Sequence, residues 1–325
     1  MGKTAVVALG GNAITRVGQA GTHAEQAENA LGMAEAVCRL RAAGWTVVLV
    51  HGNGPQVGNL AVQQLEGARE VPEQPLHVLG AMTEGQLGSL LTLALRQACG
   101  PTLSGVVTVV THVVVDPADP AFERPTKPIG PFLGETDARR HAAERGWTVG
   151  EDAGRGYRRL VASPAPLRIV ELDAVRVLVD RGLVVIAAGG GGVPVVPDET
   201  GYRGVDAVID KDLAAQRLAT ELGAEALVLV TDVPRVMLDY GTQNAREVDR
   251  MTVDEAQAHA DDHQFPEGSM GPKMRAAIQF LRAGGRLAVI TNAERACPSL
   301  DPHASPDAEL GTRIVAADLH LGAAP

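Results

Sequence analysis

The stretch TAVVALGGN, residues 4–12, decides the fold class, because a short apolar run of strand-forming residues ends abruptly in two glycines. Apolar residues at helical spacing follow over residues 23–43. A second apolar run, residues 45–50, ends in HGNGP, residues 51–55. The order strand, loop, helix, strand, loop is a βαβ unit. Its parallel strands bring both glycine loops to the edge of the sheet where open α/β proteins bind ligands.

The pattern continues along the chain. Strands are predicted over 105–111, 183–188, 226–231 and 287–290, with 312–315 as a last edge strand. Helices are predicted over 86–97, 167–181, 212–222 and 271–283, and another helix begins at the capping box TVDE, residues 252–255. The proline-rich segment 112–166 is predicted to leave the sheet as a small protruding flap. A boundary near Tyr202 divides the chain into an N-terminal lobe, 1–202, and a C-terminal lobe, 203–325.

Composition excludes several classes of function. The net charge of −10 argues against nucleic-acid binding, because no basic stripe is available to neutralise phosphates. No stretch of about 18 uninterrupted apolar residues indicates a membrane span, and the N-terminal apolar run is too short for a secretion signal. Cys38, Cys99 and Cys297 are odd in number and far apart, so we expect neither a disulfide nor a metal site, and a reducing cytoplasm.

Lysine is the rarest basic residue, with four lysines among 29 basic side chains. Lys127 lies in PTKPIG, Lys211 in DKD and Lys273 in GSMGPK. A lysine is a compact point charge, whereas arginine is a wide planar fork. Lysines retained in such motifs favour a site where a small cation meets a phosphoryl group. Asp210 is predicted to hold the lysines in place, although two carboxylates around Lys211 also suit a plain helix cap.

Glycine loops supply the other half of the predicted site. Gly10, Gly11, Asn12, Gly52 and Asn53 follow two neighbouring strands, where main-chain N–H groups form an anion cradle. Ordinary glycine turns are the alternative for either loop alone. Neither the P-loop nor the Rossmann fingerprint is present, so both of those nucleotide sites are disfavoured.

Taken together, these motifs resemble the carbamate kinases of the amino acid kinase family. The resemblance runs from Val6 to Ile314 and rests on motifs that are specific in this order and spacing: ALGGNA, HGNGPQVG, PTKPIGP, GRG, GGGG, AVIDKD, TDV, GSMGPK and GTRI. Tyr157, Ala162 and Asn292 depart from the family pattern without removing a charged group. The segment around Glu84 is a looser match and leaves a related acceptor open.

The resemblance implies an open, mostly parallel eight-stranded sheet between two layers of helices, and a homodimer in arginine metabolism. It also implies that the N-terminal lobe binds the phosphoryl acceptor and that the C-terminal lobe binds ATP or ADP beside Thr231, Asp232, Tyr240, Met270 and Gly271. No protein metal site is expected, because Mg²⁺ would be held mainly by phosphates. Many relatives carry a lysine where this chain has Ala8, and a lysine from the flap, here Lys127, replaces it in carbamate kinases.

Three functions follow from the resemblance and the residues. The first is reversible phosphoryl transfer between ATP and carbamate, giving carbamoyl phosphate and ADP, with no general base. The second is phosphorylation of another small carboxylate-like acceptor by the same fold, which Ala8 and the Lys127 segment argue against. The third is a nucleotide-binding regulator without catalysis, which the intact set of Asp210 and three lysines argues against.

Overall fold

The computed structural model describes residues 3–10, 14–16, 18–151, 156–304 and 308–316. Its centre is an eight-stranded sheet in the order β15-β17-β16-β12-β1-β2-β9-β3, in which only the β16–β17 pairing is antiparallel. This confirms the predicted open, mostly parallel sheet. The strands are β1 (Thr4–Leu9), β2 (Thr46–His51), β3 (Val106–Thr108), β9 (Val184–Ile186), β12 (Ala226–Val230), β15 (Arg250–Thr252), β16 (Leu287–Thr291) and β17 (Thr312–Val315).

Helices cover both faces of this sheet, because its strands are apolar on both sides. Alternate residues of β1 point into different cores: Val6 and Ala8 into one, Val7 and Leu9 into the other. The helices on the Val7 side are α2 (His23–Ala42), α4 (Leu76–Cys99) and α10 (Ala293–Ser299). Those on the Val6 side are α6 (Leu172–Asp180), α7 (Lys211–Leu222), α8 (Val253–Asp261) and α9 (Met270–Arg282).

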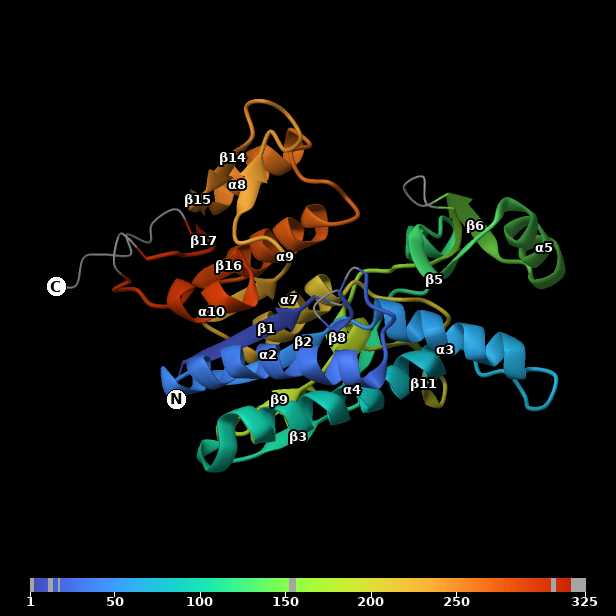
Figure 1. Cartoon of the computed structure of the whole chain (residues 1–325), viewed down its shortest axis with the longest axis horizontal. Helices are drawn as coiled ribbons and strands as arrows, with labels where there is room; N and C mark the ends of the chain where they lie inside the picture. The colour runs from blue at the N-terminus through green and yellow to red at the C-terminus, as the bar shows by residue number, and fades with distance from the viewer. Residues whose placement is uncertain (1–2, 11–13, 17, 152–155, 305–307, 317–325) are drawn as a thin grey trace.

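Two smaller sheets extend the molecule. Strands β11 (Gly201–Gly204), β10 (Val193–Asp198), β4 (His112–Val114) and β8 (Arg168–Ile169) form a four-stranded sheet. Strands β5 (Lys127–Leu133), β7 (Tyr157–Val161) and β6 (Thr148–Glu151) form a three-stranded sheet with α5 (Glu135–Arg145). Figure 1 shows β5, β6 and α5 projecting from the body of the molecule beyond α3 (Gly54–Gly67), as the protruding subdomain predicted from the prolines. The hairpin β13 (Val236–Leu238) and β14 (Arg246–Val248) stands at the opposite side.

Three local predictions are corrected. Strand β17 lies between β15 and β16, so residues 312–315 are not an edge strand. Helix α3 was not predicted, although Pro55 in its first turn is a common start signal. Cys38 on α2 and Cys99 at the end of α4 form a disulfide, which sequence reasoning had excluded. The two helices pack side by side, and that packing brings together cysteines 61 residues apart.

Helix α4 is the one described helix long and apolar enough to cross a membrane. With the turn that follows, it spans Leu76–Thr102 and contains an 18-residue window with a mean hydropathy of 1.2. Half of that apolar window is buried inside the fold, and Leu87, Leu91 and Leu95 are each 1% exposed or less. Its apolar residues therefore belong to the hydrophobic core on one face of the central sheet.

Candidate active site

A cavity of about 290 Å³ lies at the carboxyl ends of the central strands. Its walls combine the loops after β1, β2 and β12 with the start of α7, the start of α9 and strand β5 of the projecting sheet. The predicted site residues that line it are Gly10, Gly52, Asn53, Lys127, Asp210, Lys211, Thr231, Asp232 and Lys273. Gly11 and Asn12 lie outside the described residues. The topology thus brings together motifs that are more than 200 residues apart in the chain.

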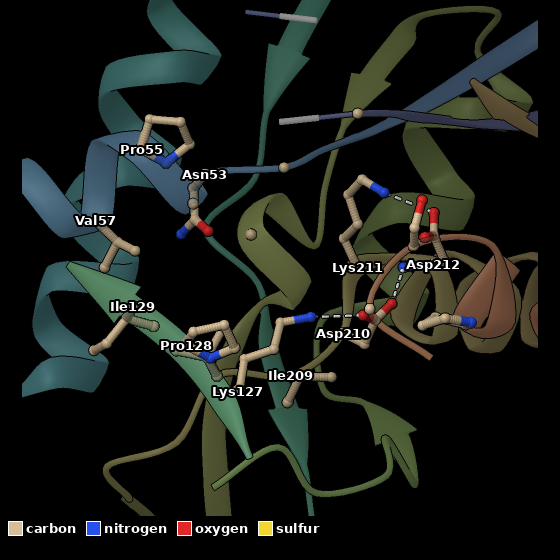
Figure 2. A pocket seen from close by; sticks show the side chains of 18 of the residues that line it. Asn53, Pro55, Val57, Lys127, Pro128, Ile129, Ile209, Asp210, Lys211 and Asp212 are labelled. Carbon is tan, nitrogen blue, oxygen red and sulfur yellow. Dashed lines mark hydrogen bonds and ion pairs between the residues drawn. The ribbon is translucent and has the colours of Figure 1, made fainter. Parts of the chain in front are cut away.

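Two aspartates organise the three lysines. Lys127 Nζ donates to Asp210 Oδ2 at 2.7 Å, whereas Lys211 Nζ and Lys273 Nζ donate to the two oxygens of Asp212 at 2.8 and 3.1 Å. Figure 2 shows Lys127 and Lys211 reaching the carboxylates of Asp210 and Asp212 from different elements. We refer to Lys127, Asp210, Lys211, Asp212 and Lys273 as the lysine cluster. The structure confirms the prediction that Lys211 and Lys273 lie together.

Asp212, and not Asp210, joins two of the lysines. Sequence reasoning gave the orienting role to Asp210 alone. Asp210 does hold Lys127, and it also caps α7 by accepting from the Asp212 N–H at 2.9 Å. The Asp212 side chain is 3% exposed and holds one lysine on each oxygen. The DKD motif already indicated a second carboxylate, because Asp212 stands in the first turn of α7. Only the packing of α9 beside α7 shows that Lys273 reaches Asp212.

The pKa values of this cluster reflect competition between burial and charge. Burial alone would raise the pKa of Asp210, but Lys127 and Lys211 more than offset it and lower the value to about 2. Burial also lowers the pKa of Lys211, yet the carboxylates of Asp212 and Asp210 outweigh it and the net shift is upward. For Lys273 the net shift is downward, because burial and the neighbouring Lys211 exceed the effect of Asp212. An added anion would favour the charged form of Lys273 and oppose this downward shift.

The cluster carries three ammonium groups and two carboxylates. Its formal charge of about +1 suits a phosphate group, which supplies negative oxygens to ammonium groups at short range. Among the described residues, no group of three His, Cys, Asp or Glu side chains gathers to hold a metal ion. Both aspartates of the cluster are already engaged by lysines, so a phosphate-borne Mg²⁺ fits this cavity better than a protein-held one.

A second cavity of about 230 Å³ adjoins the first and shares Thr231, Asp232 and Ser269 with it. Apolar side chains dominate its walls, with Met237, Tyr240, Phe265 and Met270 among them. The predicted nucleotide residues Tyr240 and Met270 line this second cavity and not the first. Gly271 lines neither cavity. It lies buried in the first turn of α9, where an added Cβ would stand 3.1 Å from the Pro266 carbonyl oxygen.

A buried polar pair lies behind the Gly52–Asn53 loop. A Cβ on Gly189 would stand 2.3 Å from His51 Nε2 and 3.1 Å from Glu84 Cγ, so the two side chains meet at that glycine. His51 is fully buried, which lowers its pKa to about 4. Burial likewise raises the pKa of Glu84 well above its usual value. Glu84 also accepts a hydrogen bond from Thr111 N–H at 2.9 Å, which lowers the pKa by less than burial raises it. Burial therefore favours the neutral form of both groups.

A sequence model of the amino acid kinase family matches residues 3–292. The chain belongs to the amino acid kinase family. It is 45% identical over 308 residues to the carbamate kinase of Pyrococcus horikoshii, covering 93% of this chain and 97% of that protein. It is 44% identical to the carbamate kinase of Trichomonas vaginalis, covering 95% and 98% of the two chains. The family resemblance read from the sequence is confirmed.

Solved structures agree with the fold. The carbamate kinase from Giardia lamblia bound to AMP-PNP superimposes with a TM-score of 0.88 at 40% identity, covering 97% of this chain and 99% of that one. N-acetylglutamate synthase from Neisseria gonorrhoeae superimposes with a TM-score of 0.60 at 17% identity, which shows the shared fold alone. The family fold thus extends over the whole described chain, including the projecting sheet.

Proposed function

We propose that the protein is an ATP:carbamate phosphotransferase, a carbamate kinase. The observation that carries the proposal is the lysine cluster: three ammonium groups, positioned by two aspartates, face one cavity with glycine loops on its opposite wall. Full-length likeness to carbamate kinases supports the choice within the family. Homologues of this length and identity, aligned end to end, favour a shared reaction as well as a shared fold.

The reaction needs no base in this cavity. A carboxylate oxygen of carbamate attacks the γ-phosphorus of ATP, an O–P bond forms, and the bond from the γ-phosphorus to the oxygen that bridges to the β-phosphate breaks to release ADP. The attacking oxygen is already anionic, so no proton has to be removed. Catalysis then consists of alignment and charge neutralisation, which is the chemistry that lysines and main-chain N–H groups supply.

Each side of the site takes one part of the reaction. The loops at Gly10 and Gly52, with Asn53, would hold the acceptor carboxylate. The cluster lysines would contact oxygens of the migrating phosphoryl group, with Asp210 and Asp212 keeping them in position. The apolar second cavity would take the nucleoside, because it opens from the first at Thr231 and Asp232. Mg²⁺, when bound with the nucleotide, would neutralise phosphate charge.

The other properties implied by the family stay predictions. The division into lobes at residues 202 and 203, a homodimer and a cytoplasmic location rest on the family and on composition. Sedimentation of the purified protein would report the dimer directly. A related small carboxylate as acceptor is the second candidate function, supported by the departure from the family pattern around Glu84.

The test is ATP formation from carbamoyl phosphate and ADP, with and without Mg²⁺. We expect rapid ATP formation that depends on Mg²⁺ and is lost in Lys211→Met, while Lys3→Met, outside the cavity, keeps the wild-type rate. A panel of carboxylates in an ADP-release assay separates carbamate from other acceptors. Tight ATP binding without transfer to any acceptor would contradict the proposal and favour the regulator.

A further inference from the structure

We propose that the side-chain oxygen of Asn53 selects the acceptor by accepting a hydrogen bond from its amino group, and that Thr83 fixes Asn53 in the orientation this requires. The proposal rests on the function above and specifies how carbamate is told apart from carboxylates of the same shape. Asn53 lines the catalytic cavity, whereas Thr83 lies one layer behind it on α4 and is fully buried. Thr83 is thus a positioning residue.

The orientation of the Asn53 amide follows from counting hydrogens. The Thr83 hydroxyl donates to the Gly80 carbonyl oxygen at 2.7 Å. A hydroxyl has a single hydrogen, so toward Asn53 it can only accept. The Asn53 group that faces Thr83 must therefore be the NH₂, and Nδ2 donates to Thr83 Oγ1 at 2.8 Å. A flipped amide would place two acceptors against each other.

Asn53 is also held from its other side. Gly190 packs against the amide so closely that an added Cβ would stand 2.1 Å from Nδ2 and 2.8 Å from Oδ1. Asn53 is 6% exposed, so close packing against the glycine turn restrains its side chain. The side chain is fixed before any substrate binds, which is what selective recognition of a small ligand requires.

The amide oxygen is left available to a ligand. Asn53 stands at the N-cap of α3, where an asparagine oxygen ordinarily accepts a main-chain N–H, yet it makes no such bond. Asn292, at the N-cap of α10, does accept from Arg295 N–H, at 3.1 Å. Among the described residues no donor reaches Asn53 Oδ1. Figure 2 shows this oxygen turned toward the side of the cavity with Lys127 and Lys211, and the nitrogen turned away from it.

An uncharged acceptor in this position discriminates by chemistry. The carboxylate of the ligand seeks N–H and ammonium donors, so it avoids the Asn53 oxygen and turns toward the glycine loops and lysines. The third substituent on the carboxylate carbon of the ligand then faces Asn53. In carbamate that substituent is an NH₂ donor. In acetate it is a methyl group of similar size, which leaves Asn53 Oδ1 without a hydrogen-bond partner.

The experiment compares carbamoyl phosphate with acetyl phosphate as phosphoryl donors to ADP, measuring kcat/KM for each. We expect the wild-type protein to favour carbamoyl phosphate. In Thr83→Val the amide loses its fixed partner, and we expect the ratio of the two kcat/KM values to fall by about 10- to 100-fold, through loss of activity with carbamoyl phosphate. Comparing ratios between variants cancels the difference in intrinsic reactivity between the two acyl phosphates.

Two further variants control the result. Thr83→Ser keeps the hydroxyl, so the ratio should return to within about threefold of wild type, given the usual scatter in such energies. Thr102→Val removes a hydroxyl that makes the same type of bond, to Cys99 O at 2.6 Å, beyond the other end of α4 and far from Asn53, and should leave both rates unchanged. Thermal unfolding of each variant verifies that it is folded.

The outcomes separate this inference from the proposed function. An unchanged ratio in Thr83→Val, or equal losses with both donors, would overturn the role of Asn53 while leaving the kinase assignment intact. A wild-type protein that forms no ATP from either donor would instead overturn the proposed function.

Discussion

The lysine cluster and the buried pair of His51 and Glu84 both lie at the carboxyl edge of the central sheet. The cluster pairs ammonium groups with carboxylates, whereas burial favours the neutral forms of His51 and Glu84. In the cluster the ionisable groups are charged, each ammonium has a carboxylate within 3.1 Å, and the cavity admits solvent. Among the described residues, each group of the pair has one buried atom without a hydrogen-bond partner, and burial shifts both pKa values toward the neutral form.

The difference shows what decides the state of a titratable side chain. Asp212 and Glu84 are about equally buried, at 2% and 1% exposed. Two ammonium groups donate to Asp212, whereas among the described residues one main-chain N–H donates to Glu84, whose pKa burial raises. The cavity side of this sheet edge thus holds paired charges, whereas the side behind the Gly52–Asn53 loop holds groups whose neutral forms burial favours.

The largest expected effect comes from removing the carboxylate that links two lysines. Asp212→Asn removes the carboxylate that contacts both Lys211 and Lys273 and leaves the two ammonium groups close together, so we expect the free energy of unfolding to fall by about 3–5 kcal/mol. Denaturant unfolding measures it. Asp173→Asn is the control, because its ion pair with Arg176 lies at the surface and should contribute at most about 1 kcal/mol. Equal effects in the two variants would contradict the special status of the cluster.

The next effect tests whether the cluster needs point charges. Lys211→Arg keeps the charge but replaces a compact ammonium, buried beside Asp212, with a wide fork. We expect turnover to fall by about 100- to 1,000-fold, the usual effect of losing one preorganised charge. Lys3→Arg, outside the cavity, should keep full activity. Near-normal turnover in Lys211→Arg would show that charge alone is sufficient.

The smallest effect concerns the buried pair of His51 and Glu84, and it is a dependence of the free energy of unfolding on pH. The pKa of His51 is about 4 in the folded protein and near 6.5 when unfolded, so the unfolded chain binds the extra proton first as pH falls. Stability should therefore decrease from pH 6.5 down to about pH 4, by about 3 kcal/mol in all. Unfolding titrations at several pH values should show this slope in wild type and in His23→Gln, which alters an exposed histidine. The part of the slope due to His51 should vanish in His51→Gln.

Sequence reasoning reached much of the fold because the decisive signals were local. The apolar run at 4–9, the helical spacing at 23–43 and the capping box at Thr252 each act within a few residues, and the structure has β1, α2 and α8 there. The glycine loops and the rare lysines were found in the same way. Helix α3 was missed because its start, Gly54-Pro55, is also a common turn signal.

What the sequence determined by itself was a set of candidate residues: the glycine loops with their asparagines, three lysines and an aspartate motif. What only the tertiary structure decided was which of them are partners. Lys273 reaches Asp212 because α7 and α9 pack together, Cys38 reaches Cys99 because α2 and α4 do, and Asn53 presents its oxygen because Thr83 is already a donor elsewhere. The physical reason is range: propensity and spacing act over a few residues, whereas an ion pair, a disulfide or an amide orientation depends on atoms that meet only after the chain has folded.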